Sequence, residues 1–286
     1  MLHVWPYILY RTSVAYDFVS KNGALIPAGD AVLPVSNIEF AYGFGVYENV
    51  RVVRGNALFL SEHIERLLRS ARVIDLKHTL DEATLAKWTL ALTEACKADA
   101  LNLKILMIGA REPKDVQLFI LPLAPLFPDK KLYVKGAIAV STEYERSFPD
   151  AKTLNMLGSY IAYRKAKENN AYDALLVNRN GCVTEGTRTN FFGIKGKTIT
   201  GAPMKEILEG VTMRHVLKVA KENGFEVTEA DIPLSSLKNF DGVFLTSTSS
   251  KIMPLSQVDG QAMQIPESLK TLMKHYEDFL EKEYAK

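Results

Sequence analysis

Apolar and polar positions along residues 14–123 repeat first with the period of strands, then with that of helices, and then with that of strands again. The first strand pair turns at Asn22 and Gly23, a dipeptide typical of tight hairpins. Ser61 precedes an apolar helical stripe and is a good N-cap, so we expect a helix to begin there. In chain order, the predicted elements are a hairpin at 14–27, a strand pair at 45–60 that turns at 54–56, a helix from Ser61, a helix at 82–97, and strands at 103–111 and 115–123.

The second half of the chain shows the same mixture of periods. Asn180 and Gly181 mark the turn of another hairpin, and Gly224 is placed to stop a helix whose apolar face includes Met213 and Val216. The predicted elements are a strand at 132–141, a helix at 156–168, a hairpin at 173–186, a helix at 212–223, strands at 242–250 and 251–260, and a closing amphipathic helix with apolar positions between 269 and 280.

Three prolines interrupt the pattern between residues 122 and 131 and mark the best domain boundary. We therefore predict a small N-terminal domain, residues 1–125, and a larger C-terminal domain, residues 126–286. Strands and helices come in mixed runs instead of strict alternation, so an α+β fold is favoured over a doubly wound sheet.

The composition excludes several classes of protein. The chain has 286 residues, of which 47% are hydrophobic, and its net charge of +2 gives no electrostatic reason to expect a nucleic acid or an anionic membrane as a partner. No apolar run is long enough to span a bilayer, and residues 1–11 lack the basic start of a signal peptide. Cys96 and Cys182 form no paired motif, which fits a reducing cytoplasm. The five histidines are scattered, which argues against a metal site.

Four short stretches carry more polar groups than a core segment should. Residues 185–190 place Glu185, Arg188 and Asn190 between strand-forming apolar residues, and such a cluster suggests a polar ligand. Residues 209–212 put a glycine and a hydroxyl at a helix start, where free backbone N–H groups favour an anion. The other two stretches are the five hydroxyls at 246–250 and Lys152 just ahead of a helix. Each alone is more often a turn, a loop or a solvated lysine.

Together, and in this order, these motifs resemble a known family. The lysine, "VTEG" with "NFF", "LEGVT" and "TSTSS" with "MP" are similar to the second half of fold-type IV (class IV) pyridoxal-phosphate enzymes. The segment "YGFGVYENVRVVRGNALFLSEHIERL" is similar to their first half, and the resemblance covers roughly residues 18–259. It implies a smaller N-terminal α/β domain, a larger C-terminal domain with a β-barrel-like core, pyridoxal 5'-phosphate as cofactor, amino acid and 2-oxo acid substrates, and a homodimer.

The resemblance also implies roles for single residues. Lys152 matches the lysine that forms the Schiff base with the cofactor and moves a proton between the substrate α-carbon and the cofactor C4′ carbon. Glu185 matches the carboxylate that faces the pyridine nitrogen. Arg66 matches the phosphate-binding arginine, although helical spacing alone makes it a solvated residue opposite the apolar face. The other implied contacts are Asn190, Val211, Thr212 and Thr248 with the cofactor, and Tyr47 and Ser249 with the substrate.

Within the family, the motifs are most similar to those of D-amino acid aminotransferases. The resemblance therefore implies transfer of an amino group from amino acids such as D-glutamate or D-alanine to a 2-oxo acid such as 2-oxoglutarate. A branched-chain L-amino acid aminotransferase is an alternative, but those enzymes usually have a tyrosine where this chain has Leu157. An aminodeoxychorismate lyase is a second alternative, but the lyases lack the arginine and hydroxyls that follow the glutamate. An anion-binding protein without catalysis is the third alternative.

The substrate anchor departs from the D-amino acid pattern. That pattern uses an Arg-x-His pair after the third strand, and the corresponding stretch here has Arg111 but no histidine. Arg188 is the nearest unassigned cation to Glu185, and we expect it to bind the substrate carboxylate instead. In a regular strand, residues 185 and 188 would point to opposite faces, but Gly186 can break the alternation. Arg51, on the same strand face as Tyr47, is the second candidate.

Overall fold

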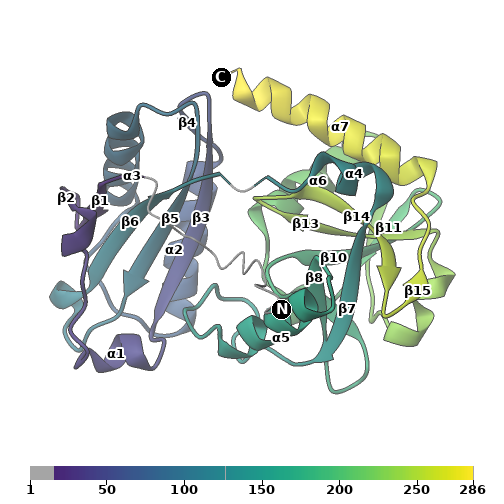
Figure 1. Ribbon diagram of the computed structural model, residues 1–286, viewed down its shortest axis with the longest axis horizontal. Coiled ribbons are helices and arrows are strands. Elements are labelled where there is room, and N and C mark those ends of the chain that lie inside the picture. Colours follow the sequence, from purple (N-terminus) through teal and green to yellow (C-terminus); the bar gives the residue numbers. More distant parts are fainter. Residues whose placement is uncertain (1–15, 126, 286) are drawn as a thin grey trace, which may run out of the picture.

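The structure is a computed structural model that describes residues 16–125 and 127–285. Its strands form two sheets that lie side by side, the first built from residues 18–123 and the second from residues 137–262 (Figure 1). The division of the chain at residues 125 and 126 stays a prediction. The expectations for residues 1–11 and for the start of the first hairpin lie outside the described residues.

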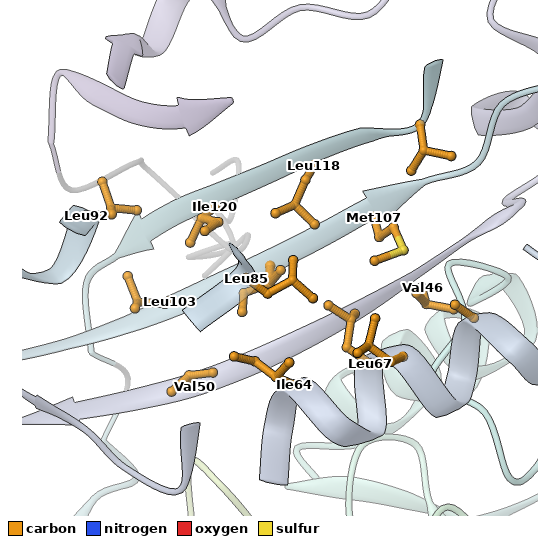
Figure 2. Close-up of a cluster of buried hydrophobic side chains, with 14 of the residues drawn as sticks. Val46, Val50, Ile64, Leu67, Leu85, Leu92, Leu103, Met107, Leu118 and Ile120 are labelled. Atoms are coloured by element: carbon orange, nitrogen blue, oxygen red, sulfur yellow. The ribbon is translucent and has the colours of Figure 1, made fainter. Parts of the chain in front are cut away.

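The first sheet has six strands in the order β2-β1-β6-β5-β3-β4, and all of its neighbouring strands are antiparallel. Helices α2 and α3 pack against it, and their leucines and isoleucine meet the strand side chains in a buried core (Figure 2). The elements of this half are β1 (Phe18–Lys21), β2 (Ala24–Pro27), α1 (Ile38–Ala41), β3 (Gly45–Val53), β4 (Asn56–Ala57), α2 (Leu60–Val73), α3 (Glu82–Cys96), β5 (Ala100–Ile108) and β6 (Gln117–Leu123), with single turns of 3₁₀ helix at Ala28–Asp30 and Pro113–Asp115.

The second sheet closes into a barrel. Six strands follow one another as β10-β13-β14-β7-β8-β9, and pairing of Asn190 in β10 with Glu185 in β9 completes the ring. The pairs of β7 with β8 and of β7 with β14 are parallel, whereas the other pairs of the ring are antiparallel. The strands of this sheet are β7 (Ala137–Glu143), β8 (Asp173–Val177), β9 (Val183–Gly186), β10 (Asn190–Lys195), β11 (Thr198–Gly201), β12 (Glu226–Glu229), β13 (Gly242–Ser247), β14 (Lys251–Val258) and β15 (Gln261–Ala262).

Helices cover the outside of this barrel. Helix α5 packs on β8, and α6 and α7 pack on each other over an apolar cluster that includes Phe244 and Tyr276 (Figure 1). None of the helices in the described ranges combines the length and the apolar character needed to cross a bilayer. The helices of this half are α4 (Lys130–Lys135), α5 (Leu157–Glu168), α6 (Val211–Glu222) and α7 (Glu267–Tyr284), with 3₁₀ turns at Met204–Glu206 and Leu234–Asn239.

Mixed sheets with separate helices confirm the predicted α+β class. Two local predictions are wrong. The first helix begins at Leu60 with Phe59 at its N-cap, and no side chain caps it, so Ser61 lies inside the helix. The predicted strand over 132–141 starts with a helix instead, because the Asp129 side chain accepts a hydrogen bond from the Lys131 N–H and opens α4. Gly136, at φ +79°, then ends α4 and lets β7 begin.

The packing of α2 on the first sheet gives a stability prediction. Leu67 is fully buried between α2 and the strands, so Leu67→Ala should lower the free energy of unfolding by about 2–5 kcal/mol through the cavity it leaves. Leu90 is half exposed on α3 and serves as the control. Leu90→Ala should change the free energy of unfolding by less than about 0.5 kcal/mol. Urea unfolding monitored by circular dichroism measures both. Equal effects of the two substitutions would contradict this packing.

Candidate functional site

One pocket of ≈ 570 Å³, including its open mouth, collects most of the residues singled out in the sequence. Its size is that of a site for a small molecule. Strand β3 of the first sheet and helix α2, which packs on that sheet, contribute side chains to the pocket. The barrel and the start of α6 contribute further side chains. The predicted site residues that line it are Tyr47, Arg66, Lys152, Glu185, Arg188, Asn190, Val211, Thr212 and Thr248.

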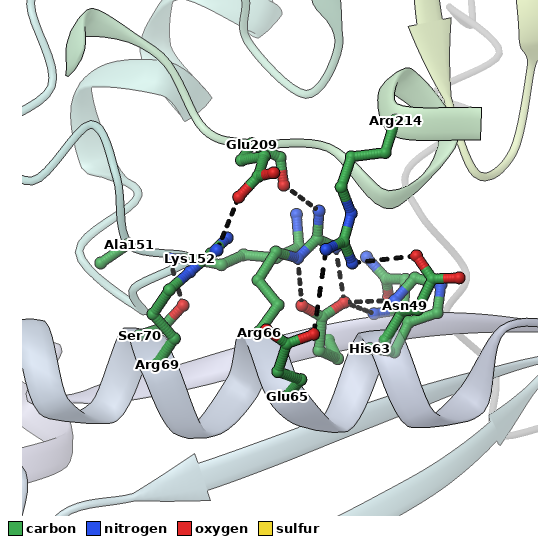
Figure 3. Close-up of polar contacts among 12 residues, drawn as sticks. Asn49, His63, Glu65, Arg66, Arg69, Ser70, Ala151, Lys152, Glu209 and Arg214 are labelled. Atoms are coloured by element: carbon green, nitrogen blue, oxygen red, sulfur yellow. Dashed lines mark hydrogen bonds and ion pairs between the residues drawn. The ribbon is translucent and has the colours of Figure 1, made fainter. Parts of the chain in front are cut away.

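Lys152 lies on a loop that is fastened to the first sheet. Its backbone N–H donates to Ser70 Oγ of α2 at 3.0 Å, and its carbonyl oxygen accepts from the Tyr47 N–H at 2.9 Å (Figure 3). The next residue, Thr153, forms an antiparallel bridge with Val46 of β3. Lys152 Nζ then lies 4.5 Å from the centre of the Tyr47 ring. These backbone bonds fix the lysine in the pocket although no regular element carries it.

Glu185 is the next-to-last residue of β9 and has two polar partners. Its Oε1 accepts from Arg146 Nη1 at 2.9 Å, and its Oε2 accepts from the Leu208 N–H at 3.2 Å. Arg146 also donates to the carbonyl oxygens of Phe148, Pro149 and Ala151, just ahead of Lys152. Arg146 therefore ties the lysine loop to Glu185. The sequence interpretation missed this arginine because nothing distinguishes it from an exposed loop residue.

Arg188 occupies a tight turn between β9 and β10, so Glu185 and Arg188 both line the pocket despite their odd spacing. The buried carboxylate of Asp173 holds this turn: it accepts from the hydroxyls of Thr187 and Thr189, the second at 3.0 Å. Burial raises the pKa of Asp173. The guanidinium of Arg188 stacks on the Tyr163 ring at 3.9 Å.

Gly186 is required at the start of this turn. A Cβ atom there would lie 2.1 Å from Thr189 Oγ1 and 2.7 Å from Asp173 Oδ2. Glycine therefore permits both the turn and the bonds that hold it, whereas the sequence interpretation expected only that Gly186 could break the strand alternation. Asp173 was not identified from sequence, because it resembles an ordinary residue at the start of a strand.

The part of the pocket around the start of α6 is suited to an anion. Helix α6 starts at Val211 with Gly210 at its N-cap and no capping side chain, so its first backbone N–H groups lack helical partners. Asn190 Nδ2 donates to the Leu208 carbonyl at 2.7 Å and holds the preceding turn, and a Cβ on Gly210 would lie 2.2 Å from Asn190 Oδ1. Thr246 Oγ1 is buried here and has no hydrogen-bond partner among the described residues.

Arg66 enters the pocket from α2 and is buried, contrary to the solvated position that helical spacing predicted (Figure 3). The reason is Glu48 of β3, a fully buried carboxylate that binds Arg66 Nε at 2.6 Å and Nη2 at 2.8 Å. His63 Nδ1 lies 2.8 Å from the same carboxylate. Neither Glu48 nor His63 was identified as a site residue from sequence, although both fall within the family-like segment.

The electrostatics of these three groups are coupled. Burial opposes the charge of Glu48, but Arg66 and His63 outweigh burial and hold the pKa of Glu48 well below its usual value. Burial also opposes the charge of Arg66, and Glu48 outweighs it, so the pKa of Arg66 rises. For His63, burial dominates and lowers the pKa, so the ring is neutral at pH 7 and Nδ1 donates to Glu48.

Two predicted residues lie away from the pocket. Arg51 lines a neighbouring pocket of ≈ 320 Å³ together with Lys251, Tyr276 and Tyr284, and its guanidinium lies over the Phe127 ring at 4.7 Å. Ser249 is exposed and is not among the residues that line either pocket. Within the described ranges, no group of His, Cys, Asp and Glu side chains is arranged to hold a metal ion.

Several known proteins are similar to this chain in sequence. The family model described as amino-transferase class IV matches residues 45–258. The D-alanine aminotransferase of Bacillus licheniformis is 31% identical over 252 residues, which cover 85% of this chain and 88% of that protein. The putative branched-chain-amino-acid aminotransferase of Methanocaldococcus jannaschii is 30% identical over 277 residues, which cover 90% of this chain and 94% of that protein.

Solved structures share the fold. The branched-chain aminotransferase from Thermoproteus uzoniensis aligns with a TM-score of 0.84 and 24% identity, covering 92% of this chain and 94% of that chain. A hypothetical aminotransferase from Mycobacterium tuberculosis, in its pyridoxal-phosphate-bound form, aligns with a TM-score of 0.79 and 20% identity, covering 91% of this chain and 97% of that chain. Similarity at these identities shows the fold. The resemblance stated from the motifs and the fold-type IV architecture that it implied are therefore both confirmed.

The buried charge of Glu48 gives a prediction about pH. Its pKa is depressed in the folded protein from its usual value of 4.5, so its stabilising contribution is complete at neutral pH and is lost as the pH falls below about 4.5. Glu48→Gln removes this contribution and leaves Arg66 without a buried counter-charge, which should cost about 3–5 kcal/mol of unfolding free energy at pH 7.

The measurement is urea unfolding at several pH values between 3 and 7. The parent protein should lose stability on acidification more steeply than Glu48→Gln does. Glu94→Gln, at an exposed position of α3, is the control substitution. Parallel acid dependence in the parent protein and Glu48→Gln would show that the pKa of Glu48 is not depressed in the folded state.

Proposed function

We propose that this chain, which belongs to the class IV aminotransferases, moves an amino group between a D-amino acid such as D-glutamate or D-alanine and a 2-oxo acid such as 2-oxoglutarate. The observation that carries the proposal is one pocket lined by Lys152, by Glu185 and by the open start of α6. Similarity to D-alanine aminotransferases over most of the chain supports the D-amino acid substrate.

The residues of the pocket fit pyridoxal 5'-phosphate as the cofactor. Its phosphate requires several donors, which Arg66, Thr248 and the N–H groups of Val211 and Thr212 can provide. The unpartnered hydroxyl of Thr246 is a further donor in the same place. Class IV aminotransferases use this cofactor, and the Mycobacterium tuberculosis protein with this fold is described with it bound.

When bound, this cofactor supplies an aldehyde that condenses with amines and a pyridine ring that accepts electrons. The side chains on either side of it have separate tasks. Lys152 Nζ would hold the cofactor through its aldehyde carbon, and as an amine beside that carbon it would carry the proton between the substrate α-carbon and C4′. Glu185, whose Oε1 and Oε2 are held by Arg146 and Leu208, would keep a proton on the ring nitrogen. Asn190 keeps the turn before α6 in place for the phosphate.

Arg188 is the proposed anchor for the substrate carboxylate. It lines the pocket from a turn that Asp173 holds in place, and a guanidinium binds a carboxylate through two parallel hydrogen bonds. Arg51 is the weaker candidate because it lines the neighbouring pocket, and Ser249 is exposed. Tyr47, beside Lys152 Nζ, is proposed to contact the substrate as well.

A second candidate is a branched-chain L-amino acid aminotransferase. It is favoured by the 30% identity to the Methanocaldococcus jannaschii protein of that putative activity. No observation favours an aminodeoxychorismate lyase. Mixing the purified protein with D-alanine, D-glutamate or L-leucine, and following conversion of the cofactor to its amine form, separates the two transaminase activities.

The protein is proposed to work as a homodimer in the cytoplasm. Exposed apolar side chains of α1 and its flank, Ile38, Phe40 and Tyr42, support a second copy as partner. Leu157 and Ile161 at the start of α5 are exposed as well. The turn after α1 meets the segment before α5, since a Cβ on Gly43 would lie 3.2 Å from the Asn155 backbone. Both cysteines are free, which supports a reducing compartment.

The role of Lys152 is tested by Lys152→Ala. This variant should lose transamination with every amino acid and should gain no mass from cofactor after borohydride reduction, because no other amine replaces Nζ. Exposed Lys165 on α5 gives the control, Lys165→Ala, which should behave as the parent protein does. For both variants, mass spectrometry measures the mass gained after borohydride reduction, and single-turnover spectroscopy measures transamination. Retained turnover in Lys152→Ala would refute the proposed function.

The role of Arg188 is tested by Arg188→Ala. A charge-assisted pair is worth about 1.5–3 kcal/mol, so kcat/KM should fall roughly ten- to a hundredfold. Arg188→Lys should restore only part of this, because lysine offers a point charge and no fork. Arg179→Ala, at an exposed arginine of the β8–β9 turn, is the control. Steady-state kinetics with D-glutamate and D-alanine measure the effect, and unchanged kinetics would assign the anchor elsewhere.

The assembly is tested by sedimentation. The parent protein should sediment as a dimer, because family active sites are completed by a neighbouring subunit. Tyr42→Asp, which places a charge in the exposed apolar group, should shift the equilibrium toward monomer and reduce activity in parallel. A fully active monomer would contradict the proposed assembly.

A further inference from the structure

The turn at residues 208–210 connects Glu185 and Asn190 of the barrel to the start of α6, and the barrel holds it on one side. The Leu208 N–H donates to Glu185 Oε2 at 3.2 Å, and the Leu208 carbonyl accepts from Asn190 Nδ2 at 2.7 Å. The residue after the turn, Val211, begins α6. A displacement of the turn would therefore move both the helix start that faces an anion and a partner of Glu185.

Helix α2 holds the same turn on its other side, through Glu209 (Figure 3). Arg69 Nη1 lies 2.6 Å from Glu209 Oε2, and Arg66 Nη1 donates to the Glu209 carbonyl at 3.1 Å. The side chains of Arg69 and Glu209 are each less than one third exposed. Arg66 is already committed to Glu48, so Arg69 is the group that engages the Glu209 side chain.

A second set of contacts, two ion pairs and a hydrogen bond to a histidine, joins α2 to α6 one turn further on. Glu62 binds Arg214 Nη2 at 2.9 Å and His215 Nε2 at 2.8 Å, and Glu65 lies 3.8 Å from Arg214 Nη1. The start of α6 thus lies between two groups of polar contacts to α2. Rotation of α6 about its axis would break one group or the other, so the pairs define the direction in which the first N–H groups point.

We propose that Arg69 and Glu209 are positioning residues of the phosphate site: their ion pair holds the turn at 208–210 so that the N–H groups at the start of α6 converge on the phosphate of the cofactor. The proposal rests on the proposed function, since it assigns these residues to the same pocket. Neither side chain has to touch the cofactor for this role. A correctly oriented helix start binds phosphate through several N–H groups at once, and a misoriented one loses them together.

Two simpler interpretations predict different behaviour. If Arg69 and Glu209 only shift the local potential, then removal of the positive charge should weaken anion binding, and removal of the negative charge should strengthen it. If the pair only joins the two halves of the chain, then its loss should resemble loss of the Arg54–Glu281 pair. That pair, at 3.2 Å, also joins the first half of the chain to α7, but both of its side chains are more than half exposed and neither residue lines the pocket.

The experiment measures the dissociation constants of pyridoxal 5'-phosphate and of pyridoxal, which lacks the phosphate, by titration of the cofactor-stripped protein. Arg69→Met and Glu209→Gln should each weaken binding of the phosphorylated ligand by about fivefold, the loss expected for one partly buried pair, and leave pyridoxal unchanged. The double variant should be no worse than either single variant, because the two side chains act as one contact. Arg54→Met should change neither constant.

Opposite signs for Arg69→Met and Glu209→Gln would overturn the proposal in favour of a field effect. Equal losses for pyridoxal and its phosphate, or no losses, would also overturn it. The exchanged pair, Arg69→Glu with Glu209→Arg, should recover part of the affinity for the phosphate ester. If the parent protein itself binds no pyridoxal 5'-phosphate, the proposed function fails first and this inference fails with it.

Discussion

Glu48 carries its negative charge on a side chain without contact to solvent, where Arg66 of α2 neutralises the charge and His63 of α2 donates a hydrogen bond to it. A buried carboxylate that lost these partners would be strongly destabilising, so strand β3 and helix α2 have to stay in one relative position. The same guanidinium donates its third nitrogen to the Glu209 carbonyl before α6. The Glu48–Arg66 ion pair inside the first half of the chain therefore orients the guanidinium that also binds the second half, at the Glu209 carbonyl.

The segments around the pocket are irregular, and each is tied by bonds from side chains to backbone groups or hydroxyls. Ser70 binds the backbone of Lys152, Asp173 binds the turn that carries Arg188, and Asn190 binds the turn before α6. Buried backbone outside helices and strands needs such partners, since its polar groups are otherwise unsatisfied. The polar residues that looked excessive in the sequence are in large part this scaffolding.

Two groups of pocket residues differ in how their chemistry is held. Near the start of α6, backbone N–H groups and hydroxyls line the pocket, and their arrangement depends on where the helix starts. Lys152 and Arg188, in contrast, are long side chains that rest against the rings of Tyr47 and Tyr163. The first arrangement suits an invariant group such as a phosphate. The second suits substrates that change between half-reactions, because side chains can adjust where a helix start cannot.

Elements with strong local signals could be predicted from the amino-acid sequence. Hairpins at Asn22-Gly23 and Asn180-Gly181, and the helix that Gly224 ends, follow from turn chemistry and periodicity within a few residues. Local reasoning failed at Ser61 and at residues 132–135, where tertiary context and the Asp129 cap outweighed the pattern. Motif order identified Lys152 and Glu185, and the absence of the usual Arg-x-His pair pointed to Arg188; the fold brings all three into one pocket.

Which charges meet depends on the packing of the whole chain. Arg66 is expected to be solvated on its helix until Glu48, 18 residues earlier, is placed beside it. Arg146 and Glu185 are 39 residues apart, and Arg69 and Glu209 are 140 apart. The free energy of a buried charge depends on the partner across the contact, and no local periodicity records that partner. Helix and turn boundaries are set by nearby residues, whereas the ion pairs that orient this site exist only once two sheets and α2 have packed together.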